Sequence, residues 1–394
     1  MWYIYKEIQE NGKGVPAMKR QTRCKWVSLF ICMLCICVLC CSVSAETAYD
    51  DFEIDGTTLV KYIGNGGEVT VPDGITEIGE WAFDSSAITK LILPETLKAI
   101  RSYAFFNCKD LREITLPASL TGLEMSEDNS SYQPQIFYNN ERLPAINVEE
   151  GNPKYISIDG VLFTANGEKL LFYPAGKNRG GQYTVPEGTK EIGYTAFDEA
   201  HLTSIHFPST LEGIYGDGCE LAFVHGLREI TVSDKNKHFY TKDGILYNRT
   251  GTLYFYPSWK AGETLEKDSF PRTLNEIGAF AFQNKQYLKS VEFPEGVRNV
   301  GWMAFDRAQS IETITFPASV SSFSGYVFAD CPKLQKVIIP NPRVSFLNYE
   351  DLGSDIFTGS NFNLVLCGPA DSKVQDYADD WGLSFEPLDA DTAD

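Results

Sequence analysis

Residues 288–294 read Leu-Lys-Ser-Val-Glu-Phe-Pro, and near-copies of this stretch decide the fold. The next copies are 311–317, Ile-Glu-Thr-Ile-Thr-Phe-Pro, and 334–340, Leu-Gln-Lys-Val-Ile-Ile-Pro, so that their prolines lie 23 residues apart. Earlier copies begin at Ile88, Leu111 and Leu202, with degenerate ones at Leu143 and Leu227. A fixed period of this length predicts a stack of small repeated units rather than a globule.

A second signature lies between these strands: an Ile-Gly or similar pair, followed by an Ala-Phe pair. One 23-residue unit is too small to bury its own apolar face, so neighbouring units must stack to bury Leu, Ile and Phe in continuous ladders. We expect alanine where backbones approach and phenylalanine in the core. The Ala-Phe pairs begin at Ala82, Ala104, Ala196, Ala222, Ala281 and Ala304.

Two units, near 143–201 and 227–287, are longer and resemble each other. Each carries an Asp-Gly pair between β-forming residues, at 159–160 and 243–244, and each then has a strand ending in Tyr-Pro. Asp-Gly in such a setting is a strong β-hairpin signal. The sequence therefore predicts a repeat solenoid with two inserted hairpins.

Together these motifs resemble the BspA-like leucine-rich repeat family, the type-5 leucine-rich repeats of bacterial surface proteins, over about Phe52 to Phe385. The resemblance implies an α/β-type solenoid, a right-handed superhelix of leucine-rich repeats of about 23 residues, with residues 364–385 as its closing unit. It also implies a secreted or surface-displayed protein that adheres to host or extracellular-matrix proteins. Residues 121–142 and 341–360 depart from the pattern; they are loops on a binding face or tolerated insertions.

The N-terminus has the features of a secretory signal peptide. Lys and Arg residues precede an apolar run at 26–43, and a small-x-small sequence suggests cleavage after Ala45. An uncleaved membrane anchor and a lipoprotein site at Cys41 are the alternatives. We expect a signal peptide at about 18–45 within an extension of 1–45, a solenoid at 46–388 and an acidic tail at 389–394.

Charge argues against two classes of partner. The chain holds 34 Lys and Arg against 53 Asp and Glu, a net charge of −19; without residues 1–45 it keeps 28 basic and 51 acidic residues, a net charge of −23. Nucleic acid and anionic lipid both need a basic face, so neither is expected.

No catalytic or cofactor motif stands out among the four histidines and ten cysteines. His201, His206 and His225 lack the spacing of a metal site, and the acidic clusters 127–128 and 379–380 lack the alternation of a calcium loop. We expect no enzyme activity, no cofactor, no metal and no small-molecule substrate.

The best candidate for a partner-binding surface follows from strand alternation. In each Leu-x-x-Ile-x-Leu strand the residues beside the central Ile point away from the core. Stacking then lines one face with Lys90, Ile92, Glu113, Thr115, Ser204, His206, Glu229, Thr231, Ser290, Glu292, Thr313, Thr315, Lys336 and Ile338. We call these fourteen residues the candidate strip.

Four cysteines lie beyond the signal segment: Cys108, Cys219, Cys331 and Cys367. Cys108 and Cys331 both follow the phenylalanine of their repeat by three residues, and equivalent positions many repeats apart cannot reach disulfide distance. We expect small, buried thiols.

Three functions therefore compete. A protein-binding adhesin would use the candidate strip. A carbohydrate-binding surface protein would use exposed aromatic residues such as Trp259 and Trp381. A passive scaffold of the cell envelope would have no partner.

Overall fold

The computed structural model describes residues 49–123, 136–215, 219–347, 356–361 and 363–388. The described residues belong to one compact unit, which spans residues 45–394. The proposed signal peptide, its cleavage site, the acidic tail and the cluster 127–128 lie outside the described residues. Within the described residues, no helix is long and apolar enough to cross a bilayer.

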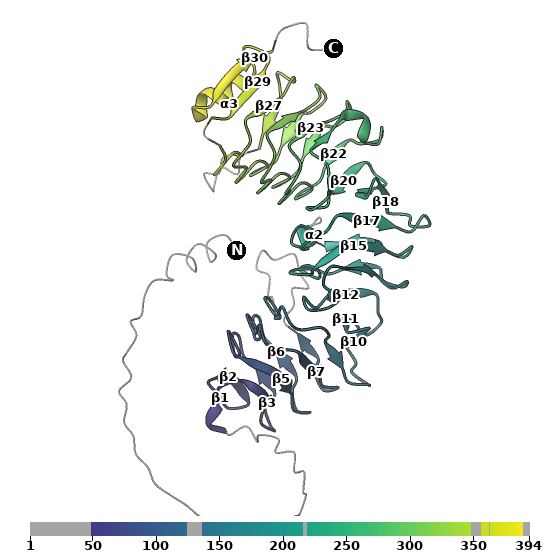
Figure 1. Ribbon diagram of the computed structural model, residues 1–394, viewed down its shortest axis with the longest axis vertical. Helices are drawn as coiled ribbons and strands as arrows, with labels where there is room; N and C mark the ends of the chain where they lie inside the picture. Colours follow the sequence, from purple (N-terminus) through teal and green to yellow (C-terminus); the bar gives the residue numbers. More distant parts are fainter. Residues whose placement is uncertain (1–48, 124–135, 216–218, 348–355, 362, 389–394) are drawn as a thin grey trace, which may run out of the picture. The chain divides into compact units, whose positions relative to one another are not determined.

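The expected repeat solenoid is confirmed, and Figure 1 shows strands of successive repeats lying side by side. One side of the coils carries three sheets, whose outward surface we call the strand face. They are β3(Gly67–Thr70)-β5(Ile88–Ile92)-β7(Glu113–Leu116)-β9(Asn147–Val148), β13(Gly181–Thr184)-β15(Leu202–Phe207)-β17(Glu229–Val232), and β21(Thr264–Leu265)-β23(Ser290–Glu292)-β25(Thr313–Thr315)-β27(Lys336–Ile338)-β29(Val365–Gly368)-β30(Ser384–Pro387).

A second side of the coils carries three further sheets built mostly of two-residue strands. They are β1(Phe52–Asp55)-β2(Thr58–Tyr62)-β4(Glu77–Ile78)-β6(Ala99–Ile100)-β8(Gly122–Leu123), β10(Tyr155–Ile158)-β11(Val161–Thr164)-β12(Lys169–Phe172)-β14(Glu191–Ile192)-β16(Gly213–Ile214), and β18(Phe239–Lys242)-β19(Ile245–Asn248)-β20(Thr252–Phe255)-β22(Glu276–Ile277)-β24(Asn299–Val300)-β26(Ser322–Phe323)-β28(Ser345–Phe346). The described helices are short: η1(Tyr49–Asp51), α2(Cys219–Ala222), η3(Lys267–Ser269) and α3(Lys373–Trp381).

Both predicted hairpins form. Ile158 pairs with Val161 across the first turn, and Lys242 pairs with Ile245 across the second. Asp159 and Gly160 have φ of 49° and 75°, and the second turn repeats this geometry. Positive φ at both central residues is what a two-residue hairpin turn with the natural twist requires.

The Ala-Phe pairs form turns on a third side of the coils, which we call the turn edge. Here the Phe83 amide donates to the Ala104 carbonyl at 2.8 Å, and the Phe305 amide donates to the Val327 carbonyl at the same distance. The glycine of the preceding pair is needed because the previous coil lies so close: a Cβ on Gly301 would come 2.5 Å from the Ala279 nitrogen.

The core consists of ladders of phenylalanine and branched aliphatic side chains. Phe282, Phe305, Phe328 and Phe357 stack with ring centroids 4.8, 5.5 and 4.9 Å apart. At the C-terminal end of this ladder, Tyr377 of α3 packs 6.2 Å from Phe357. The predicted closing unit is thus β29, α3 and β30, and its helix covers the last ring of the core.

The expectation of small buried thiols holds for Cys108, Cys331 and Cys367, which are free and buried. Cys219 lies at the start of α2, and its side chain is outside the described residues. Cys108 Sγ donates to the Phe83 carbonyl at 3.0 Å. Burial raises the pKa of Cys108 to about 11 and that of Cys331 to about 12, so both thiols stay protonated.

Candidate functional site

The structure places all fourteen residues of the candidate strip on the strand face. In β7, Ile114 is buried, whereas Glu113 is exposed and Thr115 is half-buried, and the other strands repeat this alternation. Parallel pairing in register then sets equivalent residues side by side, as for Ser290 with Thr313.

The strip is nevertheless divided into three segments, one for each sheet. Lys90, Ile92, Glu113 and Thr115 lie in the first sheet, Ser204, His206, Glu229 and Thr231 in the second, and the remaining six residues in the third. The hairpins divide them: the Ile146 amide donates to the carbonyl of Gly160 at 2.9 Å, and the Ile230 amide donates to Gly244 at 3.1 Å. A hairpin turn therefore lies against the last strand of each of the first two sheets, where the next strand of the sheet would otherwise pair.

Sequence reasoning missed several members of this surface. Glu68 pairs with Lys90, Thr184 with His206, and Thr264 with Ser290. Their strands lack the Leu-x-x-Ile opening, which hid them. A signal was present in 69–72 and 183–186, which both read apolar-Thr-Val-Pro and end in the same proline as the recognised strands.

Charges in the first segment are compensated across strands. Lys90 Nζ lies 3.3 Å from Glu113 Oε1 and 3.8 Å from Glu68 Oε1. The hydrogen bond to Glu113, together with the attraction of both carboxylates, raises the pKa of Lys90. Because these pairs face water, they contribute little to stability, and a partner can exchange them at small cost. Ile92, 39% exposed, adds an apolar contact beside them.

The second segment is held by hydroxyl contacts. His206 Nδ1 and Thr231 Oγ1 are 2.8 Å apart on neighbouring strands β15 and β17. His201 and His225 lie elsewhere: their rings stack with centroids 4.9 Å apart, and Arg179 donates to His201 Nε2 at 3.0 Å. The three histidines considered in the sequence do not form a ligand set.

The third segment combines hydroxyls with two exposed ion pairs. Ser290 Oγ donates to Thr264 Oγ1 at 3.1 Å, Lys267 Nζ lies 3.5 Å from Glu292 Oε1, and Lys336 Nζ lies 2.8 Å from Glu386 Oε2. The hydrogen bond to Lys336 lowers the pKa of Glu386.

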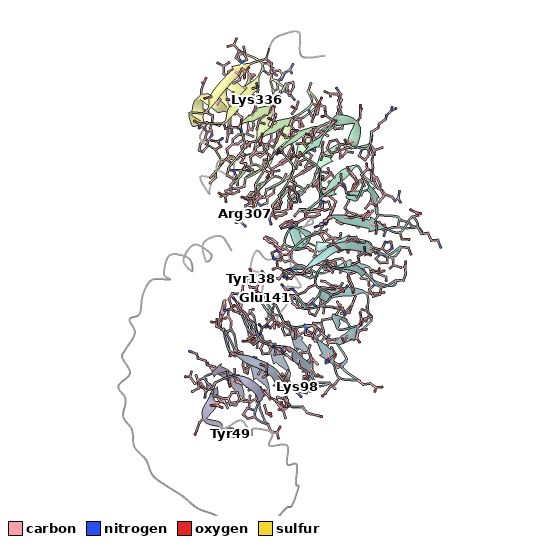
Figure 2. The ribbon with its side chains drawn as sticks, viewed as in Figure 1. Tyr49, Lys98, Tyr138, Glu141, Arg307 and Lys336 are labelled. Atoms are coloured by element: carbon pink, nitrogen blue, oxygen red, sulfur yellow. The ribbon has the colours of Figure 1, made fainter. Side chains whose placement is uncertain are left out.

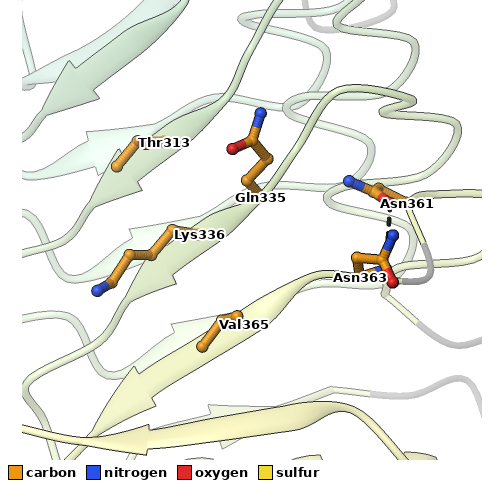
Figure 3. A pocket seen from close by; sticks show the side chains of 6 residues that line it. All are labelled: Thr313, Gln335, Lys336, Asn361, Asn363 and Val365. Atoms are coloured by element: carbon orange, nitrogen blue, oxygen red, sulfur yellow. Dashed lines mark hydrogen bonds between the residues drawn. The ribbon is translucent and has the colours of Figure 1, made fainter.

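A polar pocket of about 530 Å³ opens in this third segment (Figure 3). Its lining offers amides, a hydroxyl and an ammonium group, from Thr313, Gln335, Lys336, Asn361, Asn363 and Val365. Figure 3 shows Thr313, Lys336 and Val365 on successive strands, with the amides beside them.

A shortened repeat explains the pocket. In the recognised strands that begin at Ile88, Leu111, Leu202, Leu227, Leu288, Ile311 and Leu334, two residues separate the leading Leu or Ile from the central residue, but only Val365 separates Leu364 from Leu366. Lys336 pairs with Val365 and Val337 with Leu366, so the last coil has no counterpart of Gln335. The missing side chain leaves a gap in the ladder, and the pocket occupies it.

The described residues contain no group of three or more His, Cys, Asp or Glu side chains arranged to hold a metal ion. One unusual titratable group is buried: Lys285, whose Nζ donates to the Tyr256 carbonyl and lies 4.1 Å from the centroid of the Phe255 ring. Burial holds its pKa well below the usual range.

The two tryptophans considered for glycan binding lie outside the strands of the candidate strip. Trp259 follows β20, is half-buried and contacts Tyr287 edge-on, with ring centroids 5.9 Å apart. Trp381 ends α3, is 43% exposed and stacks on Tyr377 at 6.0 Å. Asp379 and Asp380 lie in the same helix.

Comparison with known proteins agrees with this architecture. A family model described as BspA type leucine rich repeat region matches in six copies, over residues 63–150, 178–242 and 259–378. No curated protein matches the sequence.

Solved structures are similar to the chain at low sequence identity. A leucine rich cell surface protein from Faecalibacterium prausnitzii is 20% identical, with 88% of this chain and 93% of that chain covered and a TM-score of 0.55. A leucine-rich repeat protein from Eubacterium ventriosum is 21% identical, covering 80% and 73%, with a TM-score of 0.44. The pneumococcal vaccine antigen PcpA is 18% identical, covering 82% and 79%, with a TM-score of 0.42.

Proposed function

The chain belongs to the BspA-type leucine-rich repeat family, and on that premise we propose that it is a non-catalytic adhesin of the bacterial surface. Its ligand is a host or extracellular-matrix protein, bound on the strand face. Export rests on the signal-like sequence of residues 18–45.

The observation that carries this proposal is the in-register ladder of outward side chains in the third sheet. Ser290, Thr313 and Lys336 lie at one register on three successive strands, and Glu292, Thr315 and Ile338 lie at another. Main-chain pairing fixes their spacing, so the surface is pre-organised and a partner loses little entropy in ordering it.

The pocket gives the third segment an open recess. A side chain of the bound protein can enter it and exchange hydrogen bonds with Gln335, Asn361 and Asn363, while Lys336 offers a charge. Recessed contacts of this kind, shielded from water by neighbouring contacts, account for most of the affinity in protein interfaces.

The test is a binding screen of purified protein against immobilised extracellular-matrix proteins, host-surface proteins and glycans, followed by two matched triple variants. The first places arginine at Thr115, Ser290 and Thr313 on the strand face. The second places arginine at Asn299, Ser322 and Ser345 on β24, β26 and β28, which adds the same charge to the other side of the coils.

We expect saturable binding of at least one protein, weakened by the first variant and unchanged by the second. Equal effects of the two variants would contradict the strand-face assignment. A glycan as the sole ligand would favour the carbohydrate-binding alternative, and the absence of any ligand would favour a scaffold.

A further inference from the structure

Four aromatic side chains form a contiguous cluster on the turn edge of the N-terminal coils. The Trp81 and Tyr103 rings stack with centroids 4.3 Å apart and an interplanar angle of 6°. Phe106 meets the Trp81 ring edge-on at 5.1 Å and stacks on Tyr138 at 5.3 Å. Figure 2 labels Tyr138 on this side of the coils. We call Trp81, Tyr103, Phe106 and Tyr138 the aromatic cluster.

The turn itself directs these rings outward. Ala82 and Phe83 are buried, with exposures of 1% and 0%, and they anchor the turn in the core. Trp81 precedes them in the left-handed region, with a φ of 59°. Its indole is 39% exposed. Tryptophan is usually largely buried, and exposed aromatic patches mark interaction sites.

Two carboxylates lie in the same turn as the indole, and the Asp84 amide donates to the Trp81 carbonyl at 3.0 Å. Glu80 Oε1 accepts a hydrogen bond from Trp81 Nε1 at 3.2 Å, and Asp84 Oδ1 accepts one from Ser85 Oγ at 2.9 Å. Neither carboxylate has an ion-pair partner within the part of the chain that the structure describes. The strand-face carboxylates Glu113 and Glu386, in contrast, are paired with lysines.

An exposed indole in a turn with two carboxylates that lack ion-pair partners among the described residues matches the chemistry of one side chain in particular. A guanidinium is planar, stacks on aromatic faces and donates several hydrogen bonds in a fixed fork. Carboxylates in the same turn can accept those bonds, which charge strengthens. A quaternary ammonium has no N–H to donate, and an ammonium group does not stack as a plane.

We propose that Trp81, with Glu80 and Asp84, is a binding site for an arginine side chain of a partner protein, and that the rest of the aromatic cluster contacts apolar residues beside that arginine. The net charge of −19 favours approach of a basic segment. This site lies on the turn edge and does not depend on the strand face, so either proposal can fail without the other.

The test uses three short, fluorescently labelled peptides of glycine and serine that differ only in carrying arginine, lysine or citrulline, the neutral counterpart of arginine. Fluorescence anisotropy with the purified protein at physiological ionic strength measures their affinities. We expect the arginine peptide to bind most tightly and the citrulline peptide least. Trp81→Ala should weaken arginine binding by roughly 3- to 10-fold, the size of an exposed cation–π contact plus the lost apolar area.

Three further variants separate the site from general charge attraction. Glu80→Gln with Asp84→Asn keeps the rings and should weaken binding to a similar extent, so it tests the proposal even if Trp81→Ala disturbs the turn. Tyr287→Ala removes another exposed aromatic ring and should change nothing. Trp381→Ala removes the tryptophan that lies beside Asp379 and Asp380.

Three results would overturn the proposal. One is unchanged arginine binding in both the Trp81 variant and the double carboxylate variant. Another is binding lost in Trp381→Ala alone, which would place the cation site on α3. Equal binding of the arginine and citrulline peptides to the unmodified protein would also refute a guanidinium site.

Discussion

Cys331 Sγ donates a hydrogen bond to the carbonyl oxygen of Phe305, one coil earlier, at 3.0 Å. The same position of other coils repeats this bond with different donors: Asn140 Nδ2 reaches the Phe105 carbonyl at 2.8 Å, and Ser360 Oγ reaches that of Phe328 at 2.5 Å. A buried side-chain donor, rather than a conserved residue type, thus links successive turns of the solenoid at this position.

Two substitutions of Cys331 should therefore separate the contribution of its side-chain volume to stability from the contribution of its hydrogen bond. Ala308 shows that alanine fits this position in another coil, so Cys331→Ala should fold and lose about 0.5–1.5 kcal/mol of unfolding free energy. Cys331→Ser keeps a donor and should lose less. Urea denaturation of both variants measures the difference, and a serine variant less stable than the alanine variant would contradict the hydrogen-bond role.

Cys108 and Cys331 should resist alkylation in the native protein. Burial raises their pKa to about 11 and about 12, so almost no thiolate exists near pH 8, and access is blocked as well. Iodoacetamide labelling followed by peptide mass spectrometry should find both residues modified only after denaturation. Labelling of either at native conditions, at the rate of a free thiol, would show that the coil opens locally.

Lys285 should destabilise the fold at neutral pH. Its pKa in the folded state lies below the unfolded value of 10.5, so the unfolded chain binds the proton more readily. Stability then rises with pH from the folded pKa up to the unfolded one and is lowest below that window. Lys285→Met should raise the unfolding free energy at pH 7 by roughly 1–3 kcal/mol and flatten its pH dependence. A less stable methionine variant would show that the bond to the Tyr256 carbonyl outweighs desolvation.

The His201 ring should titrate below its ordinary pKa of 6.5. Burial, with the positive charge of Arg179 and the nearby His225, lowers its pKa. Arginine can only donate, so His201 Nε2 accepts at 3.0 Å and the neutral ring carries its proton on Nδ1. NMR titration of the imidazole should show a low midpoint that rises in Arg179→Ala. An unchanged midpoint would mean that Arg179 does not contact the ring in solution.

Gly301 should be intolerant of a side chain. A Cβ there would lie 2.5 Å from the Ala279 nitrogen, whereas a Cβ on Gly213 would meet nothing within 4 Å. Gly301→Ala should cost roughly 2 kcal/mol or more because backbone must move, and Gly213→Ala should stay within about 0.5 kcal/mol. Thermal unfolding of the pair provides the measurement, and equal melting temperatures would contradict the close coil contact.

The sequence was sufficient to predict the repeat, the hairpins and the outward position of the candidate strip. The repeat period and the alternation of apolar and polar residues are local properties of the sequence. Ile114, between two polar residues, shows the alternation directly, and Asp159 marks the hairpin turn. The division of the strip into three sheets was not predictable. It depends on the hydrogen bonds that the hairpin turns at Gly160 and Gly244 accept from the last strand region of each sheet.

The pocket and the aromatic cluster were also missed, for different reasons. The pocket results from one residue missing between Leu364 and Leu366, and a deletion matters only once neighbouring coils are aligned. Phe106 follows an Ala-Phe pair, at a position that varies from coil to coil, whereas Trp81 precedes one, at a position that Tyr103 and Phe280 also fill with an aromatic residue. Their contact became visible only when the coils were stacked.

The most direct test of the proposed adhesin function is hydroxyl-radical footprinting of the protein with and without the protein ligand found in the binding screen. Our account predicts that Ile92, Ile338 and the pocket residue Lys336 lose reactivity in the complex, while Leu347 and Tyr287, exposed elsewhere, keep theirs. Protection confined to residues outside the strand face would contradict the account.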